Sequence, residues 1–376
     1  MPPDEAGGLL TIDLSALASN WRTLQDRAGA AECSAVVKAD AYGIGIEQAV
    51  PALAQAGCRT FFVAHLSEAI RVRAAAADAA VYVLNGLPPG SGDSFARWDL
   101  RPVLGSQDEV SEWAAFCGAN GTRRPAALHV DTGMNRLGLP VSEGLALTGD
   151  ERLQAFEPAL LMSHLVSAEE AENPINDRQI AAFDALRQAL PGIRASLANS
   201  SGIFLPQKPQ YDLVRPGIAL YGGNPTPSHL NPMRPVVELA GRIVQTRTVR
   251  DGETVGYNAQ WTAEGERRLA VVSVGYADGY VRAGGVTDAK RREGIPSGEV
   301  IVAGQRCPLA GRVSMDLIIV DVTDFPAGGV RRGDPVTLIG GDLTVDEVGR
   351  RAGTISYEIL TNLGRRYARA YRNTET

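Results

Sequence analysis

The chain has 376 residues, of which 44% are hydrophobic and 21% are charged, and its formal net charge at neutral pH is −6. This length favours two domains, and the composition is typical of a folded protein and argues against disorder. The negative net charge argues against a nucleic-acid-binding surface, which would require a concentrated basic patch.

The N-terminal residues and the cysteine pattern indicate a cytoplasmic protein. The opening MPPDEAGG has acids and prolines where a secretory signal needs basic residues and an apolar run, and no segment reaches the apolar length of a membrane span. We therefore expect no membrane partner. The cysteines lack C-x-x-C spacing and the four histidines are scattered, so we expect reduced, mostly buried thiols and no metal site.

From Leu9 to about Gly223, short apolar runs alternate with helical patterns. The first helix is predicted by apolar residues at helical spacing from Leu14 to Leu24. Eight apolar runs that end in polar residues or glycine predict buried strands. They span residues 33–39, 60–66, 80–86, 101–105, 126–133, 159–167, 195–200 and 212–217. Because helices separate these strands, the pattern predicts an α/β fold with an N-terminal (β/α)8 TIM-type barrel.

After the proline-rich segment 225–235, the pattern changes to strands with short glycine-marked turns. These strands are predicted at residues 236–249, 267–277, 299–305, 307–313, 317–323 and 335–341. A single helix is predicted at 344–353. We therefore expect a mostly β C-terminal domain and place the domains at residues 1–230 and 231–376.

Charged or reactive polar side chains follow several of the predicted barrel strands. Lys38 ends the first strand, Arg136 follows the fifth by a short loop, and His164, Ser200 and Arg215 end the sixth, seventh and eighth. Each of them alone has an ordinary explanation as a solvated or hydrogen-bonded residue at the rim. Because the C-terminal ends of barrel strands surround one open mouth, their convergence predicts the active site there.

Lys38 ends the apolar run AVVK, and this position suggests a reactive amine. Burial disfavours the ammonium form, and a neutral amine can form a Schiff base. Pyridoxal phosphate is the cofactor that uses such a lysine. We expect Ser200 and segment 215–218 to supply hydroxyl and backbone donors for its phosphate. The G-x-G at 43–45 lacks the third glycine of a dinucleotide-binding loop.

Nine motifs, in order and across nearly the whole chain, resemble those of the alanine racemase family. They are VVKADAYGIG, HVDTGMNRLG, MSHLVSAEE, ANSSG, LVRPGIALYG, VGYNAQW, VGYADGY, GRVSMD and ISYEIL. The resemblance implies a barrel that binds pyridoxal 5′-phosphate and a C-terminal β domain. It also implies a homodimer, with active sites shared between chains, that interconverts L-alanine and D-alanine.

The resemblance also implies individual roles. Lys38 corresponds to the lysine that binds the cofactor, and Tyr257 in VGYNA corresponds to a second catalytic base. Arg215 corresponds to the arginine that faces the pyridine nitrogen. The residues that match positions around the phosphate are Tyr42, Ser200, Gly217, Ile218 and Tyr357.

Three further residues complete the expected site. Arg136 and Met315 match positions near the cofactor oxygen and the substrate carboxylate. We assign His164 to the cofactor-binding set, as a link between Tyr257 and Arg215. Without the resemblance, Tyr257 would be interpreted as a packed aromatic residue, and Tyr276 and Tyr280 would be equally eligible as a base.

Four positions depart from the commonest family pattern. Ile44 stands where a histidine is usual, Asn258 where a glycine is usual, and Ser314 where a cysteine is frequent. His129 stands where many members carry a carbamylated lysine that orients the arginine. A histidine cannot carry that group, so the sequence leaves the orientation of Arg136 open.

The chemistry gives an independent reason for two bases. Inversion at Cα requires an acid and a base on opposite faces, and the simplest arrangement uses two residues, Lys38 and Tyr257. An arginine does not pass its proton to the ring nitrogen, so Arg215 would leave the ring a weaker electron sink and limit side reactions.

Other functions remain open from the sequence. A racemase of broader substrate range is the closest alternative, followed by a decarboxylase of the same fold and a non-catalytic pyridoxal phosphate carrier. The sequence also leaves open whether the activity serves the synthesis of a cell-wall precursor or the breakdown of alanine. Residues 282–299, longer than is usual in the family, are expected to form a surface loop of unassigned role.

Overall fold

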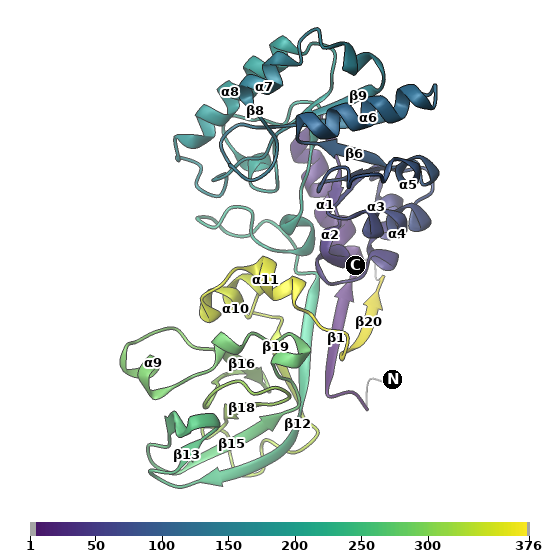
Figure 1. Ribbon diagram of the computed structural model, residues 1–376. Coiled ribbons are helices and arrows are strands. Elements are labelled where there is room, and N and C mark those ends of the chain that lie inside the picture. The colour runs from purple at the N-terminus through teal and green to yellow at the C-terminus, as the bar shows by residue number, and fades with distance from the viewer. Residues whose placement is uncertain (1–4, 374–376) are drawn as a thin grey trace. The chain divides into compact units, whose positions relative to one another are not determined.

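The computed structural model describes residues 5–373, and its contacts divide the chain into two compact units (Figure 1). One unit comprises Leu17–Leu220 and Asn224–Arg234, and we call it the barrel unit. The other comprises, among the described residues, 5–16, 221–223 and 235–373, and we call it the β unit.

The barrel unit contains a strand that overlaps each of the eight segments that the sequence predicts. Its strands are β2 (Glu32–Cys33), β3 (Ala35–Val36), β4 (Thr60–Val63), β5 (Ala80–Val83), β6 (Arg101–Leu104), β7 (Pro125–Asp131), β8 (Leu139–Pro140), β9 (Glu157–Met162), β10 (Ala195–Ser196) and β11 (Leu213–Val214). The main sheet is parallel, in the order β10-β9-β7-β6-β5-β4-β3, and the short β8 pairs with β7.

The ends of this sheet meet through β2 and β11. Val214 of β11 pairs in parallel with Cys33 of β2, whereas Ala35, two residues further on, belongs to the ladder with β4. A parallel bridge between Asn199 and Arg215 connects the chain after β10 with the chain after β11. The curled parallel sheet therefore closes, which confirms the predicted barrel architecture.

Helices form a large part of the connections between the barrel strands. They are α1 (Leu14–Ala28), which begins in the β unit, α2 (Lys38–Tyr42), α3 (Ile46–Ala56), α4 (Leu66–Ala75), α5 (Gly92–Arg97), α6 (Gln107–Ala119), α7 (Val141–Ala146) and α8 (Ile175–Ala189). Helix α6 illustrates how they form. Ser106 caps it by accepting from the N–H of Glu109 at 3.2 Å, and Val110, Trp113 and Cys117 bury one face at helical spacing.

The β unit contains one mixed sheet and a small hairpin. Its strands are β1 (Gly8–Asp13), β12 (Val237–Val249), β13 (Thr254–Val255), β14 (Trp261–Thr262), β15 (Arg267–Val272), β16 (Glu299–Val302), β17 (Gln305–Pro308), β18 (Ile318–Asp321), β19 (Pro335–Ile339) and β20 (Ala368–Arg372). The order is β17-β16-β19-β12-β1-β20, and β15 joins β12 to β18. Strand β1 pairs antiparallel with β12 and parallel with β20. The sequence pattern did not reveal β1.

The helices of the β unit are short. They are α9 (Asp288–Arg292), α10 (Val345–Ala352) and α11 (Ser356–Thr361). Helix α10 is the one predicted from sequence. Helix α9 lies within residues 282–299, so this stretch is more ordered than a simple surface loop, and Lys290 ties it down by donating to the carbonyl of Gly285 at 3.0 Å.

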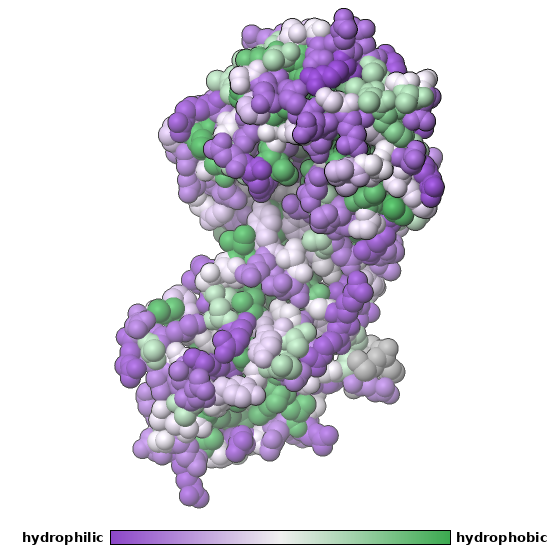
Figure 2. Space-filling view, viewed as in Figure 1, coloured by the Kyte–Doolittle hydropathy of each residue, from purple (hydrophilic) through white to green (hydrophobic). Residues whose placement is uncertain are grey.

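Hydrophilic residues gather on the surface, and the cysteines lie in the interior. Hydrophilic residues dominate the visible face of each unit in Figure 2. Cys33, Cys58, Cys117 and Cys307 are all unpaired and buried, as the sequence predicts. Within the described range, no helix is long and apolar enough to cross a membrane.

Gly279 in the β unit gives a test of the packing. It has φ +98°, and a Cβ added there would lie 1.7 Å from the carbonyl oxygen of Asn362. We expect Gly279→Ala to lower the free energy of unfolding by about 3 kcal/mol or more, because both the backbone angle and the carbonyl oppose a side chain. Urea denaturation measures this loss.

The matched control is Gly265→Ala. Gly265 also has a positive φ, +75°, but nothing lies within 4 Å of an added Cβ. This variant should lose only the roughly 1–2 kcal/mol of a left-handed residue. Equal losses for the two variants would contradict the steric explanation at Gly279.

Candidate active site

Lys38 lies two residues after the end of β3, which is a buried strand, and the chain turns there in an unusual way. The residues after it form a left-handed turn of four non-glycine residues with φ between 51° and 56°: Ala39, Asp40, Ala41 and Tyr42. Such a conformation costs roughly 1–2 kcal/mol per residue, so it persists only where surrounding contacts fix it.

Backbone and side-chain bonds fix this turn. Gly43 donates to the carbonyl of Ala39 at 2.8 Å, and Gly45 donates to that of Asp40 at 2.9 Å. The carboxylate of Asp40 also pairs with Arg71 of α4 at 2.5 Å. The turn is therefore anchored to a neighbouring helix as well as to itself.

The side chain of Lys38 is half-buried. Burial lowers the pKa of Lys38 below its ordinary value, the positive charge of Arg136 lowers it further, and Glu68 raises it. Desolvation and a like charge both disfavour the ammonium, so a larger share of the amine is neutral at physiological pH. A neutral amine is a nucleophile and a base.

A hydroxyl and backbone amides form a small cradle after β10 and β11. The Oγ atom of Ser200 accepts from the N–H groups of Gly217 at 2.9 Å and Ala219 at 3.3 Å. A Cβ added to Gly217 would lie 2.3 Å from the Tyr42 hydroxyl, so only glycine allows this close approach. Ile218, at the start of a short 3-10 helix, is buried beside them. The cradle suits an anion that accepts from hydroxyl and N–H groups.

Arg215 is almost entirely buried, with 4% of its surface exposed. Its guanidinium donates to Oγ of Ser196 and, at 2.5 Å, to the carbonyl of Ser163. No carboxylate among the described residues forms an ion pair with it. Burial lowers the pKa of Arg215 to about 9, which leaves the side chain charged at neutral pH. The barrel thus holds a permanent cation with neutral oxygen partners.

Two half-buried histidines, His129 and His164, feel the charge of this arginine and are neutral at physiological pH. Burial, followed by the charge of Arg215, lowers the pKa of His129 to about 4, although Asp131 raises it and Arg136 lowers it. The same causes, burial and then Arg215 and Arg136, lower the pKa of His164 to about 3. These mutual effects place both imidazoles within electrostatic range of the two arginines.

Three expected site residues belong to the β unit. Tyr257 is 67% exposed and Met315 is 52% exposed, whereas Tyr357 in α11 is half-buried. Tyr257 is preceded by Gly256, whose φ of +75° and approach to the Arg312 amide, 3.5 Å from an added Cβ, shape the loop. The loop displays an aromatic hydroxyl to solvent.

Backbone contacts join two other motifs of the β unit. The amide of Tyr276 donates to the carbonyl of Ser314 at 3.0 Å, and that of Ala277 donates to the carbonyl of Met315 at 2.9 Å. A Cβ at Gly275 would lie 2.2 Å from the same Met315 oxygen. The VGYADGY and GRVSMD segments are therefore packed as one backbone cluster.

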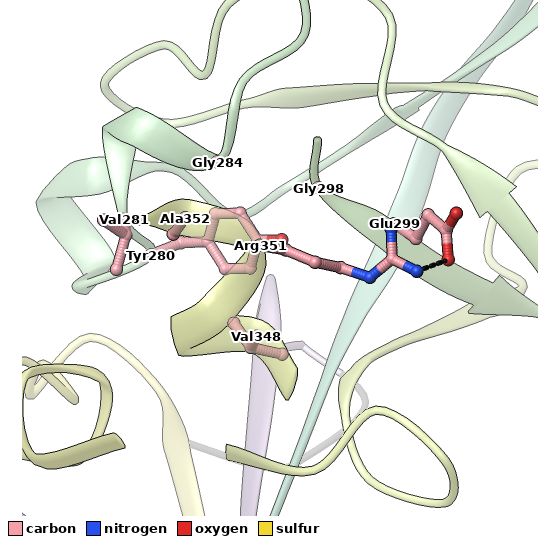
Figure 3. Close-up of a pocket in the computed structure, with 8 residues that line it drawn as sticks. All are labelled: Tyr280, Val281, Gly284, Gly298, Glu299, Val348, Arg351 and Ala352. Atoms are coloured by element: carbon pink, nitrogen blue, oxygen red, sulfur yellow. Dashed lines mark ion pairs between the residues drawn. The ribbon is translucent and has the colours of Figure 1, made fainter. Parts of the chain in front are cut away.

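The structure also distinguishes Tyr257 from Tyr280, another eligible tyrosine. In Figure 3 the ring of Tyr280 lies along the stem of Arg351, whose guanidinium pairs with Glu299 at 3.0 Å. The cavity there encloses about 10 Å³, room for at most one water molecule. Burial raises the pKa of Tyr280 to about 12, so its phenol stays neutral and has no access to a substrate.

The barrel unit alone therefore brings together most of the expected site: Lys38, Tyr42, Arg136, His164, Ser200, Arg215, Gly217 and Ile218. Tyr257, Met315 and Tyr357 lie in the β unit. The sequence analysis missed the partners of Arg215, Ser163 and Ser196. Both lie inside predicted strands, 159–167 and 195–200, and the sequence carries no signal that marks them as partners of an arginine; only the structure shows that β9 ends at Met162 and β10 at Ser196.

Family comparisons agree with this arrangement. Residues 12–225 match the family model of the alanine racemase N-terminal domain, and residues 236–371 match that of the C-terminal domain. The alanine racemase of Methylobacterium nodulans is 60% identical over 365 residues, which cover 97% of this chain and 96% of that protein.

Solved structures give the same result. A crystal structure of alanine racemase from Bartonella henselae with covalently bound pyridoxal phosphate has a TM-score of 0.91 and 39% identity, covering 98% of this chain and 100% of that one. The biosynthetic alanine racemase of Pseudomonas aeruginosa has a TM-score of 0.87 and 35% identity, covering 98% and 99%. The chain belongs to the alanine racemase family.

Proposed function

We propose that this protein is a pyridoxal phosphate-dependent racemase that interconverts L-alanine and D-alanine, with Lys38 and Tyr257 as bases on opposite faces of the substrate. The observation that carries the proposal is the desolvated amine of Lys38 in a barrel mouth that also holds an anion cradle and a buried arginine. Family membership supports the substrate.

The residues of the barrel fit the cofactor. Ser200, Gly217 and Tyr42 lie so close together that a Cβ on Gly217 would collide with the Tyr42 hydroxyl, and this group of hydroxyl and N–H donors is of the kind that a phosphate requires. Arg215 is the residue that would face the pyridine nitrogen, and Lys38 is the one that would hold the aldehyde carbon. When bound, pyridoxal phosphate stabilises the negative charge left at Cα after the α-proton is removed.

The two bases act on different faces. A neutral Lys38 takes the α-proton on one side, and its lowered pKa suits that exchange. Tyr257 exchanges a proton at its phenolic oxygen on the other side. His164 is neutral, and its pKa is lowered by the charge of Arg215. In the proposed arrangement it links the phenol of Tyr257 to the guanidinium of Arg215.

Arg215 also bears on the decarboxylase alternative. A decarboxylase that uses the ring as a strong electron sink needs an acidic partner for the ring nitrogen. The corresponding place holds a cation that is charged at neutral pH and bonded to neutral oxygens. This favours a reaction that withdraws less charge from Cα, such as racemisation.

The second unit is proposed to act in a homodimer. Tyr257, Tyr276 and Met315 are large apolar or aromatic side chains that remain exposed on the β unit, and such exposure is typical of surfaces that bind a partner. We propose that the β unit of one chain supplies Tyr257, Met315 and Tyr357 to the barrel unit of the other.

The first prediction concerns Lys38. Borohydride treatment of the yellow holoprotein should fix the cofactor covalently on Lys38, because this amine is the desolvated one at the barrel mouth. Peptide mapping by mass spectrometry locates the adduct. The other lysines are Lys208 and Lys290, and an adduct on either of them, or none, would contradict the assignment.

The second prediction concerns Tyr257→Phe, which keeps the ring and removes the hydroxyl. Solvent deuterium should then enter Cα quickly from one alanine enantiomer and slowly from the other, because Lys38 still serves its own face. Mass spectrometry of each alanine during single-enantiomer incubations follows this. Tyr276→Phe is the matched control and should affect both enantiomers equally; equal losses in Tyr257→Phe would exclude a face-specific role.

The third prediction tests the shared site. Lys38→Ala and Tyr257→Phe chains should each be nearly inactive alone. If chains reassort at random, about half of the dimers are mixed, and one of the two sites in each carries neither substitution. Co-refolding equal amounts should therefore restore roughly a quarter of native activity.

The control is each variant refolded with itself under the same conditions. A site contained within one chain leaves every site with one defect, whatever the mixture. Activity no greater than the mean of the two parents would therefore rule out the shared site while leaving the Lys38 assignment intact.

A further inference from the structure

Gln179 is a fully buried polar residue in the second turn of α8, and neither the sequence pattern nor the family motifs assign it a role. Its exposed fraction is 0%. A buried amide is costly unless its oxygen and its N–H groups all find partners. The partners of Gln179 are therefore informative.

Its side chain bonds to the chain that follows β9. The Oε1 atom accepts from the N–H of Val166 at 2.9 Å, and Nε2 donates to the carbonyl of His164, also at 2.9 Å. These two hydrogen bonds thus hold the backbone on both sides of Leu165. Just before it, the carbonyl of Ser163 accepts from Arg215. The peptide groups that flank His164 are consequently held by Arg215 on one side and by Gln179 on the other.

The same amide reaches the chain that follows β7. Nε2 donates to Oγ1 of Thr132 at 3.2 Å, and Thr132 shares a further bond of 2.7 Å with Oγ of Ser163. An added Cβ on Gly133, at φ +145°, would lie 3.6 Å from Cγ of Gln179. Thr132 and Gly133 begin the turn that leads to Arg136, and Asp131 closes this turn by accepting from the amide of Gly133 at 2.7 Å.

We propose that Gln179 is a positioning residue that holds the His164 backbone and the turn leading to Arg136 in fixed register, so that both side chains stay aligned in the active site. The proposal rests on the proposed function for its kinetic consequence. The register itself belongs to the barrel unit and does not depend on a bound cofactor.

The position at which the β7–β9 ladder ends explains why the side chain of Gln179 has this role. Strands β7 and β9 are neighbours in the sheet, but their ladder ends at the pair His129–Met162. Beyond that pair, the Thr132–Ser163 hydroxyl bond and the bonds of Gln179 connect the two strand ends. An apolar side chain of the same length would fill the space and leave the His164 carbonyl and the Val166 N–H without these partners.

The test compares Gln179→Met with Asn176→Leu. Asn176 lies on the same helix and is also 0% exposed, and its side chain donates to the carbonyls of Ser167 and Glu170 in the loop that precedes the helix. Each substitution removes one buried amide. Only the first removes a bond to the strand ends. Urea denaturation of both variants shows that they fold and compares their losses of stability.

The readout independent of activity is the histidine side-chain NMR spectrum of the cofactor-free protein. The chain has four histidines, so each ring resonance can be assigned by substitution. In Gln179→Met the ring resonances of His164 should shift or broaden while those of His65 and His229 stay in place. Asn176→Leu should leave His164 unchanged.

The kinetic readout uses the holoenzyme. A displacement of about 1 Å at a reacting group can cost ~100-fold, so Gln179→Met should lower kcat/KM by roughly 10- to 100-fold, mainly through kcat. Asn176→Leu should stay within about twofold of the unchanged protein. Thr132→Val, combined with Gln179→Met, should lose less than the product of the two single effects, because both remove the same connection.

The outcomes separate the two ideas. Unmoved His164 resonances in Gln179→Met, or equal changes in both variants, overturn the positioning role. Absence of racemase activity in the unchanged protein overturns the proposed function, whatever the NMR spectrum shows. A moved His164 resonance with a selective loss of kcat supports both.

Discussion

The site depends on one electrostatic constraint, the partial burial of the Lys38 amine close to other cations. Burial and Arg136 lower its pKa, and Arg215 lies fully buried in the same barrel without a carboxylate partner among the described residues. Concentrating positive charge in this way is unfavourable unless an anion neutralises it. In the proposed site, the cradle of Ser200 and Gly217 would hold such an anion. The charge of the barrel mouth thus favours an anionic ligand before any substrate is considered.

The backbone around Lys38 serves the same constraint. Four left-handed residues follow the lysine at once, and their conformation is held by internal bonds and by the Asp40–Arg71 pair. The last of them, Tyr42, is buried with its hydroxyl against Gly217. The turn thus connects the amine to the anion cradle through rigid covalent structure. Strain concentrated at this point is consistent with a site whose geometry must not relax.

The sequence predicted the parts of this structure whose causes are local. Apolar runs of four to eight residues identify barrel strands because strand burial is written in consecutive residues. It did not reveal β1, whose partners β12 and β20 lie far along the chain. Composition could not separate Tyr257 from Tyr280 either, because only the fold shows which one is enclosed beside Arg351 and which is exposed. Ser163, Ser196 and Gln179 were missed because their importance arises from contacts across the barrel, which no spacing rule encodes.

The two units divide the work that a racemase needs. The barrel unit contains the groups for holding an anion, a neutral amine and a buried cation, and this set would stabilise charge at Cα on its own. It offers one base on one face. In the proposed arrangement, the exposed Tyr257 of the partner's β unit adds a base on the other face. Stereochemical inversion would then be a property of the assembly, whereas activation of the α-proton would be a property of the barrel. Any change that loosens the barrel backbone near His164 should affect both, because this residue lies between the buried arginine and the incoming phenol in the proposed arrangement.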